Sequence, residues 1–415
     1  MPRQAFVLLA LAAALSGCSK HATEPAPVPP PPVPELVASQ PPARASGVLY
    51  DSDIWAQFSR PLDTRTVSPL SVFLKLDAQR LPITVSYDAI TRRISLRPSV
   101  TLLLQRTYTV EFSTAVHGAD GTPIAEGVFF QFTTNSLRRV PYDYPPAGAL
   151  EGPVSALGWG GGKGADGNIL HEVYVSTDSS QVESRAVVPF ARSVFTYYLP
   201  VTAWPLGSTV YWAITSENVT THERLAGPVQ SFRIVDAGTP MDSLTILALD
   251  HGSNDARTRP FPAYCNRGEL PCGPNFNGSL HWYYADLPGN VRFAGATLRL
   301  TAQDAYSGMI AASAPTLWMA QQVWLPCSVG APGPPFPEVG GLLAGAGATS
   351  PNLAEFSSDR LSAYFEAQYR GRAYLYGTIV RADQDIFFHS TLSADLSTRP
   401  RAVVRFYRLP TAVAP

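Results

Sequence analysis

The sequence contains little charge and no long hydrophobic run. Charged residues make up only 15% of the 415 residues, and the 31 basic residues nearly cancel the 32 acidic ones. No basic cluster occurs, so nucleic acid is not expected as a partner. The apolar run Ala5–Leu15 is about a dozen residues long, whereas a transmembrane helix needs roughly 20. The sequence therefore predicts no membrane-spanning helix.

Catalytic and cofactor motifs are also missing. The seven histidines include no His-Glu-x-x-His pair, and no Gly-x-Ser-x-Gly element presents a nucleophilic serine. No pair of carboxylates stands in a motif that indicates glycoside hydrolysis. We therefore expect no enzyme activity, no catalytic residues and no cofactor. A hydrolase with an unrecognised site in the C-terminal segment stays open as an alternative.

Proline, glycine and aromatic residues are abundant instead. The chain holds 39 Pro, 31 Gly, 18 Tyr and 19 Phe, a composition typical of many short strands joined by turns. Segments such as Thr107–Phe112 alternate apolar and polar residues with a period of two, which predicts strands with one buried face. Because a chain of this length is too long for one core, we predict an all-β protein of tandem β-sandwiches.

The N-terminus has the features of an export signal. Arg3 precedes the apolar run, and small residues then lead to a cysteine in Leu15-Ser16-Gly17-Cys18. This order resembles the bacterial lipobox, which implies that residues 1–17 are a signal peptide and that Cys18 is lipidated. Several acyl chains on one cysteine suffice for stable membrane anchoring. No acidic residue follows Cys18, and by resemblance to Gram-negative lipoproteins this implies the outer membrane. Whether the protein faces the periplasm or the cell surface stays open.

Residues 18–43 are predicted to form a linker after the lipidated cysteine. Nine prolines fall between Pro25 and Pro42. Such a run lacks backbone donors and favours the extended polyproline II conformation. We expect this segment to hold the folded part of the chain away from the membrane.

The first two folded segments resemble known β-sandwich domains. Residues 44–136 resemble bacterial Ig-like domains, which usually act as spacers or adhesive modules. Residues 140–236 resemble fibronectin type III-like domains. The segments that carry the two resemblances are Phe58–Asp63, Tyr108–Val110 and Phe130–Thr134 for the first, and Val173–Asp178, Leu206–Trp212 and Gly227–Phe232 for the second.

The third segment, residues 240–412, is the largest. It resembles jelly-roll domains of the disaggregatase-related and carbohydrate-binding-module type. The carrying segments are Ala296–Leu300, Phe387–Ser390 and Arg399–Tyr407. The resemblance implies a jelly-roll-like sandwich that binds polysaccharide. An insert rich in Pro, Gly and Ala at residues 330–350 has no assigned role.

Aromatic residues in the third segment are the best candidates for ligand binding. In a strand, Trp282 and Tyr284 lie on the same face, and an exposed pair of this kind stacks well on a sugar ring. Trp318 and Trp324 are candidates for the same groove. The alternative for all four is an ordinary place in the sandwich core.

Cysteine and acidic residues add two further candidates. Three cysteines follow Cys18, and an exported protein favours a disulfide between Cys265 and Cys272. A pairing of Cys272 with Cys327 stays open, whereas zinc is disfavoured because Cys-x2-Cys spacing is missing. Oxygen ligands in one short segment indicate a structural calcium site at Asp250, Asn254 and Asp255.

Together these features predict a non-catalytic, lipid-anchored protein of the cell envelope. Its expected roles are adhesion, scaffolding or surface presentation, and its expected partners are the membrane, an envelope protein or a polysaccharide. A carbohydrate-binding lipoprotein acting through residues 240–412 is the alternative. Fold alone does not decide between them.

Overall fold

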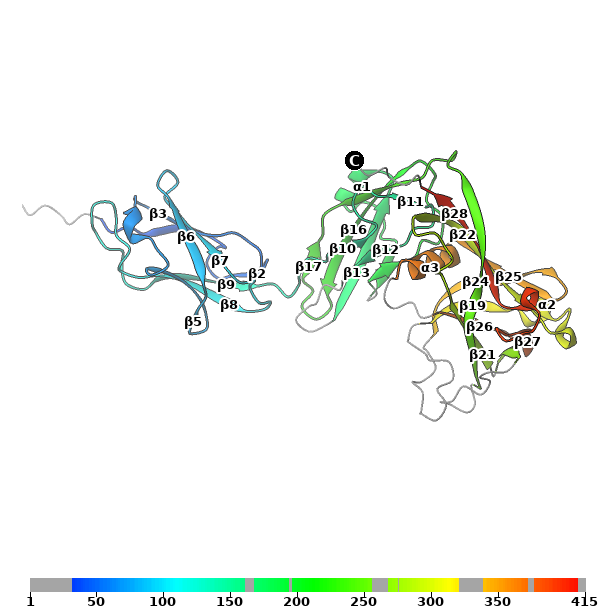
Figure 1. The fold of residues 1–415 in the computed structure, drawn as a ribbon. Coiled ribbons are helices and arrows are strands. Elements are labelled where there is room, and N and C mark those ends of the chain that lie inside the picture. Colours follow the sequence, from blue (N-terminus) through cyan, green and yellow to red (C-terminus); the bar gives the residue numbers. More distant parts are fainter. Residues whose placement is uncertain are drawn as a thin grey trace, which may run out of the picture. The chain divides into compact units, whose positions relative to one another are not determined.

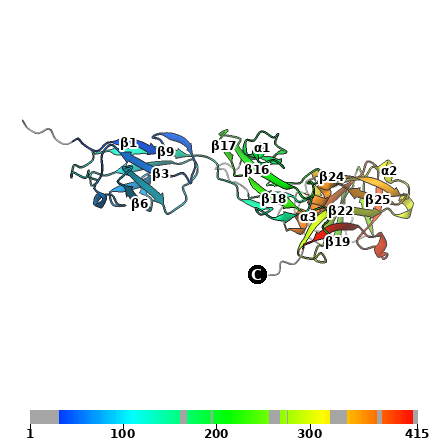
Figure 2. The ribbon, with the colours of Figure 1, turned by 90° about the horizontal axis from the view of Figure 1, so that it is seen from above.

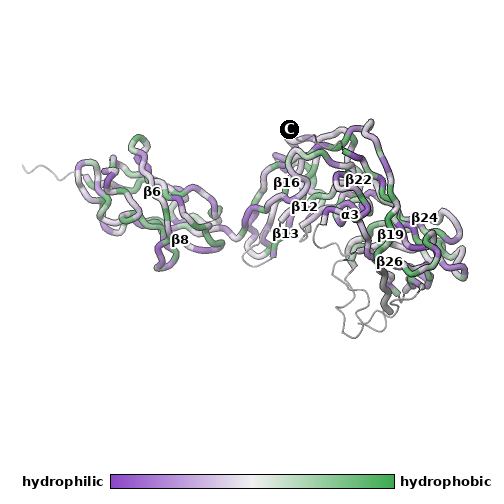
Figure 3. Tube along the Cα trace, in the orientation of Figure 1, coloured by the Kyte–Doolittle hydropathy of each residue, from purple (hydrophilic) through white to green (hydrophobic). Residues whose placement is uncertain are grey.

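The computed structural model describes residues 32–160, 168–193, 196–255, 268–274, 276–320, 339–371 and 377–409. Strands dominate (Figure 1), so the predicted all-β class is confirmed. Figures 2 and 3 show the same elements from above and by hydropathy, with apolar and polar residues interleaved along the chain. No helix in the described part of the chain is long and apolar enough to cross a bilayer.

Contacts divide the chain into two compact units. Unit 1 comprises Met1–Arg44, Asp53–Val100 and Tyr108–Gln131, and unit 2 comprises Ala45–Ser52, Thr101–Thr107 and Phe132–Pro415. The predicted signal peptide, and the linker as far as residue 31, lie outside the described residues. The predicted boundary between residues 236 and 240 falls inside unit 2.

The first sandwich has two antiparallel sheets, one with the order β1-β3-β7-β6 and one with β9-β8-β4-β5, to which β2 adds a parallel edge strand. Its strands alternate as predicted: Ile54, Ala56 and Phe58 of β3 are buried. Phe58 packs edge-on against Phe112 with ring centroids 5.3 Å apart. The elements are β1 (Leu36–Gln40), β2 (Ala45–Val48), β3 (Ile54–Phe58), η1 (Thr64–Thr66), β4 (Val72–Leu76), β5 (Gln79–Arg80), β6 (Ile83–Asp88), β7 (Arg93–Pro98), β8 (Thr107–Phe112) and β9 (Val128–Thr134).

The second sandwich packs a small sheet, β10-β12-β15, against a larger one with the order β11-β18-β16-β13-β14 and β17 beside β16. Strand β11 pairs in parallel with β18, and the other pairs of the larger sheet are antiparallel. Trp159, Trp212 and Phe232 are buried in its core. The elements are β10 (Tyr142–Tyr144), β11 (Leu150–Glu151), β12 (Leu157–Trp159), β13 (Ile169–Ser176), α1 (Ser179–Glu183), β14 (Ala191–Ser193), β15 (Tyr197–Tyr198), β16 (Thr209–Asn218), β17 (Arg224–Ala226) and β18 (Gln230–Ile234).

The third segment is a jelly roll whose two sheets join at both edges into a closed barrel. The order around the barrel is β19-β21-β26-β23-β24-β25-β22-β28. The strands that belong to both sheets are β19 and β24, the first and fifth of these strands along the chain. The interleaving of strands from two Greek keys is the jelly-roll order. The elements are β19 (Met241–Asp255), β20 (Glu269–Cys272), β21 (Phe276–Trp282), β22 (Val291–Thr301), η2 (Asp304–Tyr306), α2 (Ile310–Ser313), β23 (Thr316–Ala320), β24 (Val339–Ser350), β25 (Leu353–Ser357), α3 (Asp359–Tyr369), β26 (Thr378–Arg381), β27 (Ile386–His389), η3 (Leu396–Thr398) and β28 (Arg401–Arg408).

Helix α3 fills the space beside the barrel and reaches the second sandwich. Ser358 caps its N-terminus by accepting a hydrogen bond from the Leu361 N–H at 2.9 Å, which satisfies one of the free backbone donors there. The stretch 361–367 is buried throughout. One hydrophobic core joins Phe365 of α3 and residues of the barrel strands to Val154, Ala156 and Leu199 of the second sandwich. The second and third segments are therefore packed together within unit 2.

Candidate functional site

Trp282 and Tyr284 do not form the exposed platform that the strand pattern suggested. Trp282 is 8% exposed, packs on Phe365 of α3 at 5.1 Å, and donates from Nε1 to Thr378 Oγ1 at 3.2 Å. Tyr284 is half-buried, and its hydroxyl donates to Gln368 Oε1 at 2.5 Å. The pair does share a face, but that face packs against α3, which leaves no open ring for a sugar. The core alternative therefore describes these two residues.

The other predicted tryptophans fall in different places. Trp318 lies on β23, is half-buried, and donates from Nε1 to Thr316 Oγ1 at 2.9 Å. Trp324 lies outside the described residues. Trp318 is on the opposite side of its sheet from Trp282, since Leu317 and not Trp318 belongs to the core. The structure thus does not bring Trp282 and Trp318 together in one groove.

The described residues include only some of those in the cysteine and calcium predictions. Cys272 is a free thiol buried in the core, and burial raises the pKa of this thiol. Cys265, its predicted disulfide partner, lies outside the described residues, as does Cys327, so the structure gives no support to a bridge.

The proposed calcium ligands lie along an extended strand. Asp250, Asn254 and Asp255 all belong to β19, which runs to its last residue without a turn. Four residues of extended strand separate the Cα atoms of Asp250 and Asn254 by about 13 Å, a separation unlike that of a compact ligand loop. The side chains of these three residues lie outside the described part of the structure. Calcium binding here stays a prediction.

A buried charged cluster joins the second sandwich to the barrel, and sequence reasoning missed it. Glu151 on β11 and Glu366 on α3 are each 1% exposed. Arg292 Nε lies 3.0 Å from Glu151 Oε2, and Arg370 Nε lies 2.9 Å from Glu366 Oε1. Arg370 Nη2 also reaches Glu151 Oε2 at 3.4 Å. Because a buried charge is costly unless it is paired, this cluster fixes how α3 meets the second sandwich.

Tyr144 links the two carboxylates of this cluster. Its hydroxyl oxygen lies 2.6 Å from Glu151 Oε2 and 2.7 Å from Glu366 Oε1. A phenol has one hydrogen, so both contacts are hydrogen bonds only if one carboxyl group is protonated. Burial raises the pKa of Glu366, although Arg370 acts in the opposite direction. Burial also raises the pKa of Tyr144 well above its ordinary value, which keeps the phenol protonated.

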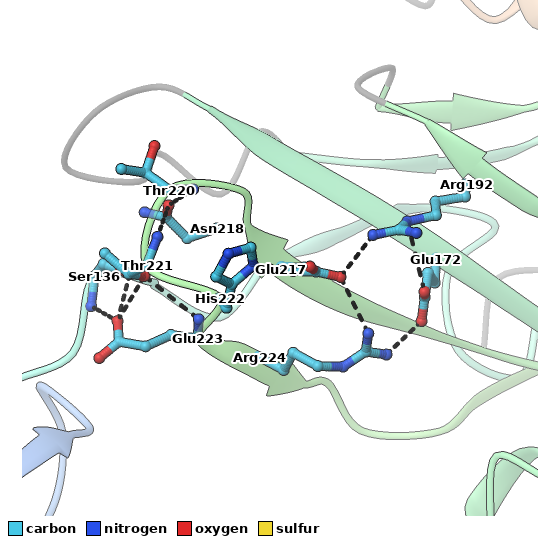
Figure 4. A network of polar contacts seen from close by, with 10 residues as sticks. All are labelled: Ser136, Glu172, Arg192, Glu217, Asn218, Thr220, Thr221, His222, Glu223 and Arg224. Atoms are coloured by element: carbon cyan, nitrogen blue, oxygen red, sulfur yellow. Dashed lines mark hydrogen bonds and ion pairs between the residues drawn. The ribbon is translucent and has the colours of Figure 1, made fainter.

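A second network of charges lies on the large sheet of the second sandwich (Figure 4). Arg224 lies between two carboxylates: Nη2 is 2.5 Å from Glu172 Oε2 and Nη1 is 3.1 Å from Glu217 Oε2. Arg192 makes a matching pair of contacts, at 3.8 Å to Glu172 and 2.9 Å to Glu217. Burial acts to raise the pKa of Glu172, but hydrogen bonds from Tyr174 and Arg224 outweigh it and lower the pKa. The negative charges of the two carboxylates equal the positive charges of the two guanidinium groups.

The same figure shows how the segment after β9 is held to the β16–β17 turn. Glu223 Oε2 accepts a hydrogen bond from the Ser136 backbone N–H at 2.6 Å and a short one from the Ser136 hydroxyl. The Thr221 hydroxyl lies 3.0 Å from Ser136 Oγ. These contacts lie within unit 2 and fix the beginning of the segment after residue 132 against the β16–β17 turn.

These polar and charged networks are suited to stabilising the fold. The buried carboxylates of the described residues, Glu151, Glu172 and Glu366, each contact at least one arginine. Within the described ranges, no group of three or more His, Cys, Asp and Glu side chains could hold a metal ion.

Comparison with known families identifies one part of the chain. Residues 31–134 match the family model of the bacterial Ig-like domain. This match confirms the Ig-like prediction for the first sandwich. Among curated proteins, none matches the chain.

Solved structures give only distant likenesses. The N-terminal part of the bacterial S-layer protein SbsC is 16% identical, with a TM-score of 0.23 over 49% of this chain and 44% of that chain. The MG0-NIE-MG1 domains of Escherichia coli alpha-2-macroglobulin are 9% identical, with a TM-score of 0.26 over 78% of this chain and 96% of that chain. A putative membrane-anchored protein from Corynebacterium diphtheriae is 9% identical, with a TM-score of 0.20 over 92% and 84%. These scores carry no functional argument, so residues 31–134, a bacterial Ig-like domain, are the part of the chain whose family is identified.

Proposed function

We propose that this protein is a non-catalytic lipoprotein of the bacterial cell envelope, anchored through Cys18, in which an Ig-like spacer presents the packed pair of second sandwich and jelly roll. The observation that carries the proposal is the order of the N-terminal features. The lipobox-like Leu15-Ser16-Gly17-Cys18 is followed by a proline-rich segment and then by a bacterial Ig-like domain.

The interior of unit 2 supports a scaffolding role. One shared core and one charged cluster hold the second sandwich and the jelly roll together as a rigid pair. The charged cluster consists of Glu151, Glu366, Arg292 and Arg370. A rigid pair presents its surfaces in a fixed arrangement, which suits presentation of a binding face. The buried carboxylates are engaged by arginine, which favours a structural role over a catalytic one.

Replacing the cysteine tests this proposal. Cells of a Gram-negative host that express wild-type protein or Cys18→Ser are labelled with an alkyne fatty acid and then fractionated. We expect wild-type protein to carry the label and to sediment with the outer membrane, and Cys18→Ser to lose both properties. Cys327→Ser, which leaves the lipobox intact, is the matched control and should behave as wild type. A Cys18→Ser protein that stays labelled and membrane-bound would contradict the proposal.

A further inference from the structure

Exposed leucines gather at one edge of the jelly roll, where β19 meets the loop of residues 391–400 between β27 and β28. They are Leu247 (39% exposed), Leu249 (61%), Leu392 (53%) and Leu396 (59%). The other exposed large apolar side chains in the described part of the jelly roll are only Met241, Tyr283 and Leu342. A single exposed leucine is ordinary, whereas several in one place indicate an interaction surface.

The two strand leucines share the outer face of the barrel. Ile246 and Ala248 belong to the hydrophobic core, and neighbours along a strand point to opposite faces. Leu247 and Leu249 therefore point outwards. Leu249 lies where the register between β19 and β21 shifts, and such a bulge commonly re-aims a side chain.

Arg401 connects the first strand leucine with the loop. It is the register partner of Leu247 on β19, so the two side chains lie on the same face. Its Nη1 donates to the carbonyl oxygen of Ser397 in a short hydrogen bond. Because Ser397 follows Leu396 in the chain, Arg401 lies between Leu247 and Leu396.

Arg399 stands in the same relation to the other two leucines. The pairing of β19 with β28 continues into the loop, since the backbone N–H of the residue before Leu249 donates to the Pro400 carbonyl oxygen at 3.0 Å. Arg399 therefore lies beside Leu249. Its Nε donates at 2.8 Å to the carbonyl oxygen of Ser393, the residue that follows Leu392. These four leucines and two arginines form the leucine–arginine cluster.

The leucine–arginine cluster carries a positive charge. Residues 391–401 contain two arginines, no lysine and one acidic residue, Asp395. The Asp395 carboxylate accepts hydrogen bonds from the Ser397 backbone N–H at 2.8 Å and from its hydroxyl at 2.7 Å. Within the described ranges the two arginines donate to backbone carbonyls and form no ion pair, whereas the neighbouring Arg299 contacts Glu355.

This combination of side chains fits a lipid surface better than a protein partner. Elements that lie in a membrane interface place aliphatic side chains at the boundary between head groups and acyl chains, with cations next to them at the anionic head groups. The guanidinium N–H groups that do not contact a carbonyl can bind phosphate oxygens. Binding sites for proteins depend instead mostly on Trp, Tyr and Arg, with leucine under-represented, and the cluster contains no aromatic residue.

We propose that the leucine–arginine cluster docks the jelly roll on a membrane surface that contains anionic phospholipid. The leucines enter the boundary between head groups and acyl chains, and Arg399 and Arg401 bind lipid phosphates. This surface is a second membrane contact besides the acyl chains at Cys18. It rests on the proposed function for the presence of a membrane near the protein, but the contact itself does not require lipidation.

Binding is tested with the mature chain from Ser19 to Pro415, made without signal peptide and lipid so that acylation of Cys18 cannot contribute. The probes are vesicles of phosphatidylcholine alone and vesicles of phosphatidylcholine and phosphatidylglycerol in equal amounts. In sedimentation assays we expect the chain to bind the mixed vesicles at least tenfold more tightly. This preference should decrease as the salt concentration rises.

Two double variants separate the contribution of the leucines from that of the arginines. Leu249→Ser combined with Leu396→Ser should weaken binding to the mixed vesicles at least tenfold, because two inserting side chains lose their apolar surface. Arg399→Gln combined with Arg401→Gln should remove the preference for phosphatidylglycerol. Thermal unfolding shows whether each variant is folded.

Matched controls lie outside the leucine–arginine cluster. Leu342→Ser changes an exposed leucine of β24, and Arg97→Gln changes an exposed arginine of the first sandwich. Both should bind vesicles as wild type does. The proposal is overturned if the wild-type chain sediments with neither vesicle, if the folded leucine variant binds normally, or if Leu342→Ser binds as weakly as that variant. It is also overturned if the cluster proves to join two copies of the chain, seen as a dimer that only the leucine variant abolishes.

Failure of this proposal can be distinguished from failure of the anchor. Vesicle binding by the mature chain, together with an unacylated Cys18 in cells, would contradict the anchor and support the docking surface. An acylated protein whose unlipidated chain ignores both vesicles would support the anchor and overturn the docking surface.

Discussion

His171 is buried on β13 in the second sandwich, and its surroundings favour the neutral ring. Its Nδ1 lies 3.0 Å from Ser216 Oγ, and its ring packs edge-on against Trp159 at 5.7 Å. Burial lowers the pKa of His171 from 6.5 to about 4. Between these two pH values the unfolded chain binds a proton that the folded chain excludes, so stability falls as the pH falls from 6.5 towards 4.

Replacing His171 by Asn should remove this acid sensitivity. Asn keeps a polar group near Ser216 but cannot take up a proton. We expect unfolding followed by tryptophan fluorescence to show that the wild type loses about 2 kcal/mol over this range and that His171→Asn loses much less. His222→Gln, at an exposed position, is the control. An unchanged pH slope in His171→Asn would show that this histidine is not the source.

Glu151 and Glu366 lie in one cluster but should respond differently to substitution. A raised pKa means that the folded state holds a proton on Glu366 more tightly than the unfolded chain does. This contribution is present below the unfolded pKa of about 4.5 and is lost as the pH rises through the folded pKa. A glutamine at this position resembles the protonated acid in shape and in carrying no charge.

We therefore expect Glu366→Gln to cost less stability at pH 7 than Glu151→Gln does. Glu151→Gln removes the charge paired with Arg292 and Arg370 and should cost about 3 kcal/mol. Chemical denaturation of the two variants at pH 7 measures the difference. Equal destabilisation by both substitutions would mean that Glu366 is ionised in the fold.

At the scale of elements, α3 explains both the error about Trp282 and the contact between segments. The sequence pattern correctly predicted that Trp282, at the end of β21, and Tyr284 share a face, but it could not say what covers that face. The covering helix is buried throughout residues 361–367, and the buried stretch includes the polar Ser362 and Glu366, so no apolar stripe beside an exposed polar face marks it in the sequence. The N-capping residue Ser358 was the remaining local signal in the sequence for this helix.

The close approach of β11 to β22 depends on Gly152. A Cβ atom at this position would lie 2.1 Å from the carbonyl oxygen of Phe293, which is backbone and cannot rotate away. We expect Gly152→Ala to cost about 2 kcal/mol or more and to separate the unfolding of the second sandwich from that of the jelly roll in calorimetry.

Gly158→Ala is the matched control for this prediction. The added Cβ would meet Tyr144 Cβ at 3.8 Å, an ordinary contact. It should leave the unfolding profile as in wild type. A single cooperative transition in Gly152→Ala at the wild-type temperature would contradict the importance of this contact.

At the scale of the whole molecule, local sequence patterns predicted the class of fold. The candidate site, by contrast, is formed by contacts between residues that are far apart in the sequence. Period-two alternation in segments such as Thr107–Phe112 identified strands, and the Ig-like segment followed from its own residues. The charged cluster could not be predicted, because Tyr144 and Glu366 are 222 residues apart in the chain and no local motif links them.

The most direct test of the account is the mass of the mature N-terminal peptide. Trypsin cleavage after Lys20 of protein purified from outer membranes should release Cys18-Ser19-Lys20, and mass spectrometry should find it with acyl chains on the cysteine and on the new amino terminus. An unmodified Cys18, or a mature chain that begins at another residue, would contradict the claim that this protein is a lipid-anchored component of the envelope.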